Sequence, residues 1–304
     1  MGLKAWTRPR PDPHAEPSQK CGQTPPSRHR NATRAGQGLW QSRLVHALAA
    51  VAAPTPDWRL AAVLAVLVVI AVATSYAGQL GVQRDLVTAA ARAVVQLAAV
   101  SLIIAAALRS VWWSMAVVLV MYLVAVGTSA RRMNLMPVQW PWVGAAIAAG
   151  VVPVLVLSLG SGVVPFNGAG IVPIAGIVIG GMMTAATLTG RRASDELNRQ
   201  FGSYEAGLSL GMPQADAAFL VMQPAGREAL TPGLDQTRTV GLVTLPGAFV
   251  GVLLGGGTAY EAAAAQILVL IGLMAGQAIT TAVLLRLLAA GRVVRRDLLA
   301  IYPR

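Results

Sequence analysis

Apolar runs long enough to cross a lipid bilayer follow one another from residue 59 almost to the end of the chain. A transmembrane helix needs about 20 mostly apolar residues. Inside a bilayer, only helices and closed barrels satisfy every backbone hydrogen bond. The runs that meet the length requirement are 59–77, 88–108, 111–130, 142–160, 170–190, 239–256 and 265–288. We therefore predict an all-α polytopic membrane protein with about seven transmembrane helices.

The composition supports a membrane protein and argues against a nucleic-acid partner. Of the 304 residues, 55% are hydrophobic and 12% are charged, whereas soluble domains carry about 25% charged residues. Basic residues outnumber acidic ones by 24 to 12, but the arginines sit mostly at the ends of apolar runs, where the positive-inside rule accounts for them. The single cysteine, Cys21, excludes a disulfide framework and a multi-cysteine metal site.

The arginines also predict an orientation. Basic residues follow the third, fifth and seventh runs and occur in the loop 78–87, whereas the loops 161–169 and 257–264 have none. These basic positions are Arg84, Arg131, Arg132, Arg191, Arg192, Arg292, Arg295 and Arg296. The rule then predicts a multi-pass protein of the cell membrane with an outside N-terminus and a cytoplasmic C-terminus.

Residues 1–58 differ in composition from the rest of the chain, 59–304, which we expect to form one transmembrane domain. They are rich in Pro, Arg, Ser and Gln, which predicts a disordered basic tail. The charge of this tail opposes an outside N-terminus, so its side stays open. A translation start inside the tail would leave the membrane body intact, so whether Met1 is the true start also stays open.

One large polar segment, 191–238, separates the fifth and sixth runs, and we predict that it forms a cytoplasmic helical hairpin. Asp195 and Arg199 are spaced as an i,i+4 pair that would extend the fifth helix. Gly211 is a candidate helix stop and Pro213 suits a first helical turn. Four apolar residues then share one helical face: Ala215, Ala218, Phe219 and Met222. That face is either a docking surface or part of a re-entrant loop packed on the body.

Catalytic constellations are missing from the body. The three histidines, His14, His29 and His46, all lie in the tail, and no Asp or Glu lies deep in an apolar run. This excludes a His/carboxylate metal site, a Ser-His-Asp triad and a buried carboxylate relay in the body. The last lysine is Lys20, so the body cannot contain a G-x-x-x-x-G-K-[ST] phosphate loop. We expect no enzyme activity in this chain, and any ATP must be bound by another chain.

Polar and sulfur-containing residues inside the runs are candidates for a translocation path. Arg92 and Gln96 share one helical face, and an intramembrane arginine is a functional hypothesis. The full candidate set is Arg92, Gln96, Met182, Met183, Thr184 and Gln266. Snorkelling of the arginine, interhelical hydrogen bonds and methionine packing are the alternatives.

Small residues four apart in the last three runs predict close helix packing. These positions are Gly176 and Gly180, then Gly247, Gly251 and Gly255, then Gly272 and Gly276. Pro246 would remove a hydrogen bond within the run 239–256 and kink it. Asp235 and Arg238 precede that run on the predicted cytoplasmic side, so the run is a candidate moving element.

Four segments carry a resemblance to a known family: "RAVVQL" (92–97), "VPIAGIVIGGMM" (172–183), "LSLGMPQADA" (208–217) and "REALTPGLDQTRTVGLVTLPGAFVGVLLGG" (227–256). They resemble the FetB-type ABC transporter permease family, which contains bacterial iron-export permeases and plant relatives linked to aluminium tolerance. The resemblance covers roughly residues 60 to 296. One departure is Gly181, where the family carries an asparagine, and this puts the substrate in doubt.

The resemblance implies a homodimeric permease in the lipid membrane that exports iron or another metal with two separate cytoplasmic ABC ATPase subunits. It implies no cofactor on this chain, with ATP and magnesium bound by the partner. "EAGLSLGMPQ" also resembles the loop through which such permeases engage their ATPases. That likeness implies coupling roles for Glu205, Leu210, Gly211, Pro213 and Phe219. The alternatives are an ABC exporter of an organic or sugar-nucleotide solute, a secondary transporter, and a non-transporting scaffold.

Overall fold

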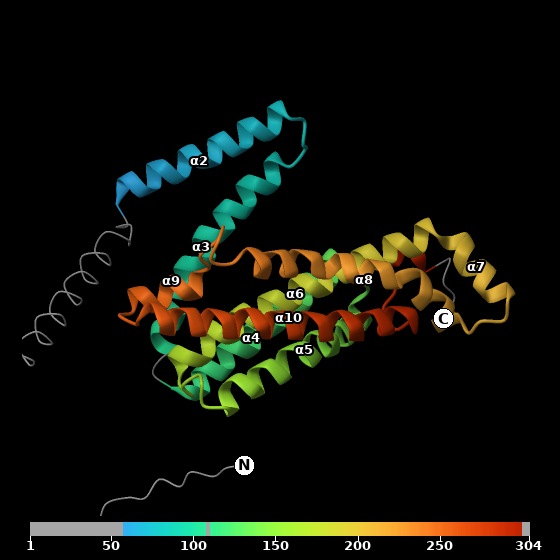
Figure 1. The fold of residues 1–304 in the computed structure, drawn as a ribbon. Helices are drawn as coiled ribbons and strands as arrows, with labels where there is room; N and C mark the ends of the chain where they lie inside the picture. The colour runs from blue at the N-terminus through green and yellow to red at the C-terminus, as the bar shows by residue number, and fades with distance from the viewer. Residues whose placement is uncertain (1–56, 108–109, 300–304) are drawn as a thin grey trace, which may run out of the picture. The chain divides into compact units, whose positions relative to one another are not determined.

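The computed structural model describes residues 57–107 and 110–299, with side chains given except for 102–107. The predicted tail, apart from its last two residues, therefore lies outside the described residues, as do Cys21 and all three histidines. Within the described part, every regular element is helical, and one isolated bridge joins Val240 and Thr244. The prediction of an all-α polytopic membrane protein is confirmed (Figure 1).

The helices follow in the order α2 (Trp58–Ala77), α3 (Gln83–Ala107), α4 (Val111–Arg132), α5 (Trp140–Gly160), α6 (Gly168–Arg199), α7 (Phe201–Ser209), α8 (Gln214–Thr239), α9 (Gly247–Leu254) and α10 (Ala259–Ala289). Two short 3₁₀ turns complete the described elements: η1 (Pro137–Gln139) lies between α4 and α5, and η2 (Arg296–Leu298) follows α10. By length and composition, five of the described segments can cross a membrane: α2, α4, η1 with α5, α6 and α10. The predicted count of seven spans stays a prediction.

Local signals in the sequence fix where the long helices begin. The Asn167 side chain accepts a hydrogen bond from Gly170 N at 2.9 Å and caps α6. Thr258 and Glu261 form a reciprocal capping box at the start of α10. Both caps stand directly after short connections, so α6 and α10 begin at defined positions.

Glycines allow the helices α4, α5, α6, α8 and α10 to pack as one bundle. At the crossing of α5 and α10, a Cβ on Gly150 would overlap both Thr280 Oγ1 and the Gly276 carbonyl. Met182 of α6, which is fully buried, fills the space beside this crossing. Gly190 of α6 similarly accepts the sulfur of Met133, which follows α4, directly over its Cα. Close packing of backbones thus forms the core of the bundle.

The predicted glycine motifs fall into two groups. Gly176 packs against Met121 of α4 and Gly272 against Val154 of α5, as expected for close helix approach. Gly180, Gly247 and Gly251 have no atom within 4 Å of a Cβ built on them, and Gly255 faces only carbonyls of its own helix. Within the described chain, the glycines of the run 239–256 make no close contact with another helix, so their packing role stays a prediction.

The run 239–256 is not one continuous helix, contrary to the prediction. The preceding helix α8 extends to Thr239, the chain is irregular from Val240 to Pro246, and α9 then has only eight residues. Pro246 caps the start of α9 instead of kinking the middle of a span. The physical reason is that Pro246 has no N–H to donate and Gly241 adopts a left-handed φ of 79°, so neither continues a helix.

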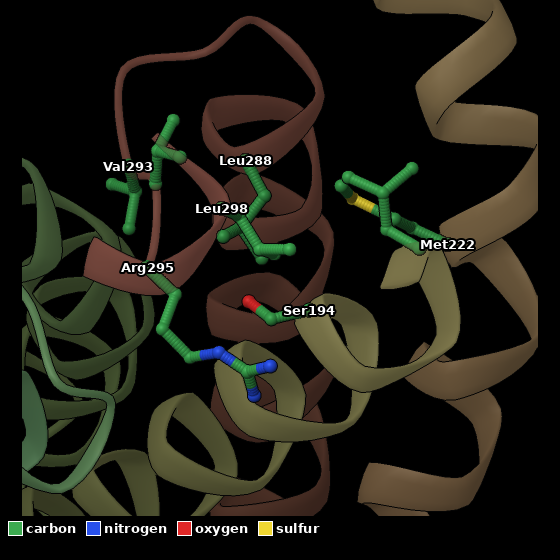
Figure 2. A pocket seen from close by; sticks show the side chains of 8 residues that line it. Ser194, Met222, Leu288, Val293, Arg295 and Leu298 are labelled. Carbon is green, nitrogen blue, oxygen red and sulfur yellow. The ribbon is translucent and has the colours of Figure 1, made fainter. Parts of the chain in front are cut away.

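A short C-terminal strap, residues 291–299, closes the arginine-rich end of the bundle (Figure 2). Its buried side chains Val293 and Leu298 pack beside Met222 of α8 and Leu288 of α10. Arg295 of the strap forms an ion pair with Asp195 of α6 and another with Asp297 at 2.7 Å. Burial lowers the pKa of Arg295, but its hydrogen bonds to Asp297 and Asp195 outweigh this and leave the pKa above the ordinary value.

The strap also corrects one predicted pair. Asp195 bonds to Arg295, while Arg199 pairs with Glu196 at 2.8 Å, so the expected Asp195–Arg199 pair is absent. The helical extension that this pair predicted is nevertheless present, because α6 continues to Arg199.

Candidate functional site

The helix α8 places charged residues beside membrane-crossing helices, and this is the central feature of the candidate site. It packs on α6 and α10, and it runs along α10 in Figure 1. Gly226 lies against Leu285, since a Cβ there would be 2.5 Å from Leu285 Cδ1. Gly233, two turns later, lies against the Gln277 amide. The last turns of α8 therefore reach about the middle of α10.

Four charged residues lie on this part of α8. Glu228 pairs with Arg192 of α6 at 3.5 Å, and Asp235 pairs with Arg238 at 3.4 Å. The Asp235 and Arg238 side chains are 58% and 72% exposed, and Arg227 is also exposed. Asp235 lies outside the apolar runs of the sequence, as expected, but the packing of α8 places it beyond the level of Gln277 on the membrane-crossing helix α10.

The same packing changes the picture of the segment 191–238. Its first part contains α7, a turn and the start of α8, and its second part runs along the bundle; the cytoplasmic side of this hairpin stays a prediction. The apolar face of α8 is covered by α6 and α10 and is therefore not free for docking. The buried residues of that face are Ala217, Ala218, Val221, Met222, Ala225, Gly226 and Ala229. This outcome matches the alternative of a segment packed on the body.

A break in the helical backbone follows α8. The irregular residues 240–246 lie between the levels of Gln277 and Gln266 on α10, because Phe249 N of α9 donates to Gln266 Oε1 at 3.3 Å. Leu242 and Val243 of the break are 89% and 78% exposed. Irregular backbone at this depth is tolerated where it is buried in protein or lines a water-filled cavity. The break thus directly continues the charged end of α8.

Hydroxyl groups line the interior next to this feature. Thr187 Oγ1 of α6 donates to Ser129 Oγ of α4 at 3.1 Å, and Thr189 bonds to Thr281 of α10 at 3.1 Å. Thr280 Oγ1 is buried and has no hydrogen-bond partner within the described residues. The two bonded pairs join α6 to α4 and to α10 by interhelical hydrogen bonds.

The path candidates from the sequence are not brought together. Arg92 and Gln96 lie exposed on α3, whose main contacts are with α2 and α4. Met182 is fully buried, and Met183 packs partly buried against the core. Thr184 is exposed and donates to Gly180 O at 3.0 Å, while Gln266 is buried beside α9. Among these candidates, Gln266 lies nearest the break.

The coupling candidates, by contrast, cluster at the tip of the α7–α8 hairpin. Leu210 is 85% exposed and Gly211 adopts a left-handed φ of 84°, which turns the chain between the helices. Glu205 is exposed on α7, and Pro213 immediately precedes α8. Phe219 lies two turns into α8 with the Arg286 guanidinium 5.3 Å from its ring centre. The tip anchors to the bundle through Tyr204, which is buried in the core.

An apolar groove of about 710 Å³ opens at the opposite end of the bundle. It lies between α6, α9 and α10 and is lined by Ile174, Ile177, Gly251 and Leu268 among others. Glu261 is its one charged lining residue, and that carboxylate is engaged in the α10 capping box. Within the described residues, no group of three or more His, Cys, Asp or Glu side chains could hold a metal ion.

The sequence did not predict that α8 packs in the bundle, because its charged residues indicated a solvent-exposed segment. A signal was present: Ala218, Met222, Ala225, Gly226 and Ala229 form a stripe of mostly small residues at helical spacing. Gly233 continues this stripe. A stripe of small residues beside charged ones indicates a helix that is packed on one face and hydrated on the other.

Comparisons with known proteins agree on one family. The family model described as "Uncharacterised protein family (UPF0014)" matches residues 58–292. The chain is 30% identical to the UPF0014 membrane protein STAR2 of Oryza sativa subsp. japonica over 246 residues, which cover 80% of this chain and 82% of the relative. It is 30% identical to the protein ALUMINUM SENSITIVE 3 of Arabidopsis thaliana over 220 residues, or 72% and 80% of the two chains.

A bacterial relative is more distant. The chain is 26% identical over 217 residues to the Escherichia coli protein named "Probable iron export permease protein FetB", covering 71% of this chain and 84% of the relative. No solved structure matches.

Proposed function

The chain belongs to the UPF0014 family of membrane proteins, and from this premise we propose that it is the transmembrane permease subunit of an ATP-driven exporter of iron or another metal. The metal is suggested by the name of the Escherichia coli relative. The fold itself supports a transporter, and the chain's lack of a phosphate loop supports a separate ATPase subunit.

One observation carries the proposal: α8 holds an exposed ion pair, Asp235 with Arg238, at about half the length of α10. Ionisable residues at membrane depth are costly, and they mark ion or substrate pathways when they face the interior or a water-filled cavity. A non-transporting scaffold would gain nothing from this pair. A water-filled path along α8 would solvate this ion pair.

The proposed path continues through the break at 240–246 toward α9. Discontinuous helices near the bilayer midplane form substrate sites in many transporters, where unwound carbonyls coordinate cations. The break interrupts the helical hydrogen bonds between α8 and α9, and Gln266 places an amide oxygen beside it, where that oxygen accepts from Phe249 N. Oxygen ligands of this kind bind a hard cation weakly, which suits an exporter that must release its substrate.

The ATPase partner would engage the α7–α8 hairpin. No lysine follows Lys20, so a phosphate loop must come from another chain. Leu210 and Gly211 form an exposed tip, and α8 leads from that tip directly to Asp235 and the break. A push on the hairpin would therefore move the proposed path. In this arrangement the arginine-rich end faces the cytoplasm, in line with the positive-inside rule.

A second copy of the chain would complete the permease. Arg92 and Gln96 lie exposed on α3, and no acidic partner for Arg92 is found among the described residues. An arginine on an apolar helix needs either the bilayer surface or a polar partner. A homodimer that apposes α3 to the path would supply one.

The test is ATP-dependent metal transport in inside-out vesicles that contain this chain and its ATPase. Asp235→Asn is expected to reduce iron uptake at least about tenfold, because the remaining Arg238 is then an uncompensated charge. Asp216→Asn is the matched control, since Asp216 is exposed in the first turn of the same helix. Equal transport by both variants would contradict a substrate path along α8. A lack of metal uptake by the unmodified protein would contradict a metal as the substrate.

A second test addresses coupling. Gly211→Trp is expected to abolish co-purification of the ATPase, whereas Gly202→Trp on α7 should leave it intact. Both glycines have open space around them, so neither change disturbs packing, but only Gly211 has a left-handed φ at the tip. If Gly211→Trp retains both the ATPase and transport, the hairpin is not the coupling element.

A further inference from the structure

A groove between α8 and α10 carries two arginines that the ion pairs of the bundle do not use. It has a volume of about 320 Å³, and Arg227 of α8 and Arg286 of α10 both line it. The ion pairs of the described residues involve other arginines. The groove therefore holds two positive charges with no acidic partner in the described part of the chain.

The floor of this groove is mostly apolar. Its lining residues apart from the two arginines are Phe219, Gln223, Gly226, Leu230, Ala278, Thr281, Ala282 and Leu285. On α10 the apolar surface continues toward the middle of the helix through Ile279 and Ile271, which are 36% and 56% exposed. An amphiphile with a negative head and a hydrocarbon chain matches a cationic rim on an apolar floor.

The length of α10 indicates that the two arginines lie near the height of a lipid headgroup. With 31 residues, α10 is about 46 Å long, compared with about 30 Å for a bilayer's hydrocarbon core. Arg286 is in the last turn of α10, so it lies near the bilayer surface. Arg227 follows Gly226, which packs against Leu285, and this places Arg227 within about one turn of that level.

Phe219 holds one of the arginines in place. The Arg286 guanidinium lies over the Phe219 ring with Cζ 5.3 Å from the ring centre. A guanidinium stacked on a ring by its face keeps the N–H groups on its edge available for a phosphate. The stacking thus pre-orients a donor toward the groove.

We propose that this groove binds an anionic phospholipid, with the phosphate held between Arg227 and Arg286 and an acyl chain lying along Leu230, Ala278 and Ala282. Basic pockets between membrane helices bind such headgroups through this chemistry. The proposal does not depend on the transported substrate or on the ATPase, since it uses only charges and surfaces of this chain.

Native mass spectrometry of the full chain in detergent, titrated with phosphatidylglycerol, tests the site. The double variant R227Q/R286Q is expected to bind the lipid about 25-fold more weakly, because each arginine should contribute about 1 kcal/mol to the binding of an anionic lipid. The matched control R132Q/R296Q removes the same charge from exposed arginines at the same end of the bundle. An equal loss of lipid binding in both variants would show that only the total positive charge matters, and it would overturn the proposed site.

A second variant tests the floor without touching the arginines. Ala282 is exposed in the groove, so Ala282→Trp should fill the acyl position and weaken phosphatidylglycerol binding at an unchanged unfolding temperature. Phosphatidylcholine binding as tight as phosphatidylglycerol overturns the anionic headgroup. Displacement of the lipid by millimolar glycerol phosphate overturns the lipid in favour of a soluble phosphate. If R227Q/R286Q loses its dimer but still binds the lipid, the lipid proposal is overturned, and the groove instead contacts a second copy of the chain.

Discussion

Two regions of the molecule contain similar apolar residues but bury them to different extents. One is the bundle of α4, α5, α6, α8 and α10, and the other is the pair α2 and α3. In α6, half of the most apolar stretch is buried, compared with 6% in α2. Each bundle helix contains glycine, whereas α2 and α3 contain none. Lipid is as apolar as leucine, so apolar surface alone does not pull helices together in a bilayer. Glycine crossings and hydrogen bonds, not hydrophobicity, distinguish the packed helices here.

The largest effect is expected at the tightest crossing. Gly150→Leu would force a side chain into Thr280 and into the backbone carbonyl of Gly276, which cannot rotate away. We expect a loss of about 3 kcal/mol or more in the free energy of unfolding, measured by denaturation in mixed micelles. Gly251→Leu, with open space around it, should be nearly neutral. A large loss at Gly251 would instead show that α9 has a partner outside this chain.

Truncation of leucines should separate the two regions more finely. Leu284 is fully buried in the bundle, and Leu284→Ala is expected to cost about 2–5 kcal/mol in unfolding free energy. Leu67 of α2 is 56% exposed, and Leu67→Ala should stay within about 0.5 kcal/mol. Comparable losses for the two would contradict the distinction between a packed and a lipid-facing region.

The strap should contribute less than the core. Arg295→Gln removes the ion pairs with Asp195 and Asp297, and we expect a loss of about 1–2 kcal/mol in unfolding free energy. The raised pKa of Arg295 means that deprotonation would remove this contribution only above the ordinary arginine range, so stability should not change between pH 7 and 9 through this group. Arg296→Gln, at an exposed neighbour, is the control; an equal loss there would exclude a specific role for the pairs.

The smallest effect concerns one interhelical hydrogen bond. Thr189 and Thr281 bond at 3.1 Å across α6 and α10. A double-mutant cycle with Thr189→Val and Thr281→Val should give a coupling energy of about 0.6 kcal/mol, typical of such bonds in membranes. A coupling energy near zero would leave glycine packing as the main cause of cohesion in the bundle.

Hydropathy predicted the long helices well because the apolar runs at 59–77, 111–130 and 142–160 match helices to within a few residues, and the run 170–190 forms the first part of α6. The helix–stop–helix at Gly211 also followed from local turn chemistry. The failures occurred where tertiary packing overrides local composition. A charged α8 lies in the bundle because its opposite face is small enough to pack, and hydropathy averages over both faces. The partner of Asp195 was missed because Arg295 lies 100 residues away in the sequence.

The site could be predicted only in part for the same reason. Residue type indicated the turn at Gly211 and the candidate Gln266, but the placement of Asp235 and Arg238 beside α10 depended on contacts between distant segments. Roles for Arg92 and Thr184 stay predictions, because single-chain packing leaves both side chains exposed.

The sulfur of Met133 over Gly190 sets a rule for how relatives of this chain can diverge. The two positions share one volume, so the residue at one limits the residue at the other. A relative with alanine or serine at the position of Gly190 should carry a shorter side chain at the position of Met133, and the two should change together. Gly150 has no such freedom, because a carbonyl of the main chain occupies part of the space opposite it. Substitution histories should therefore show covariation at the first pair and near-invariance at Gly150.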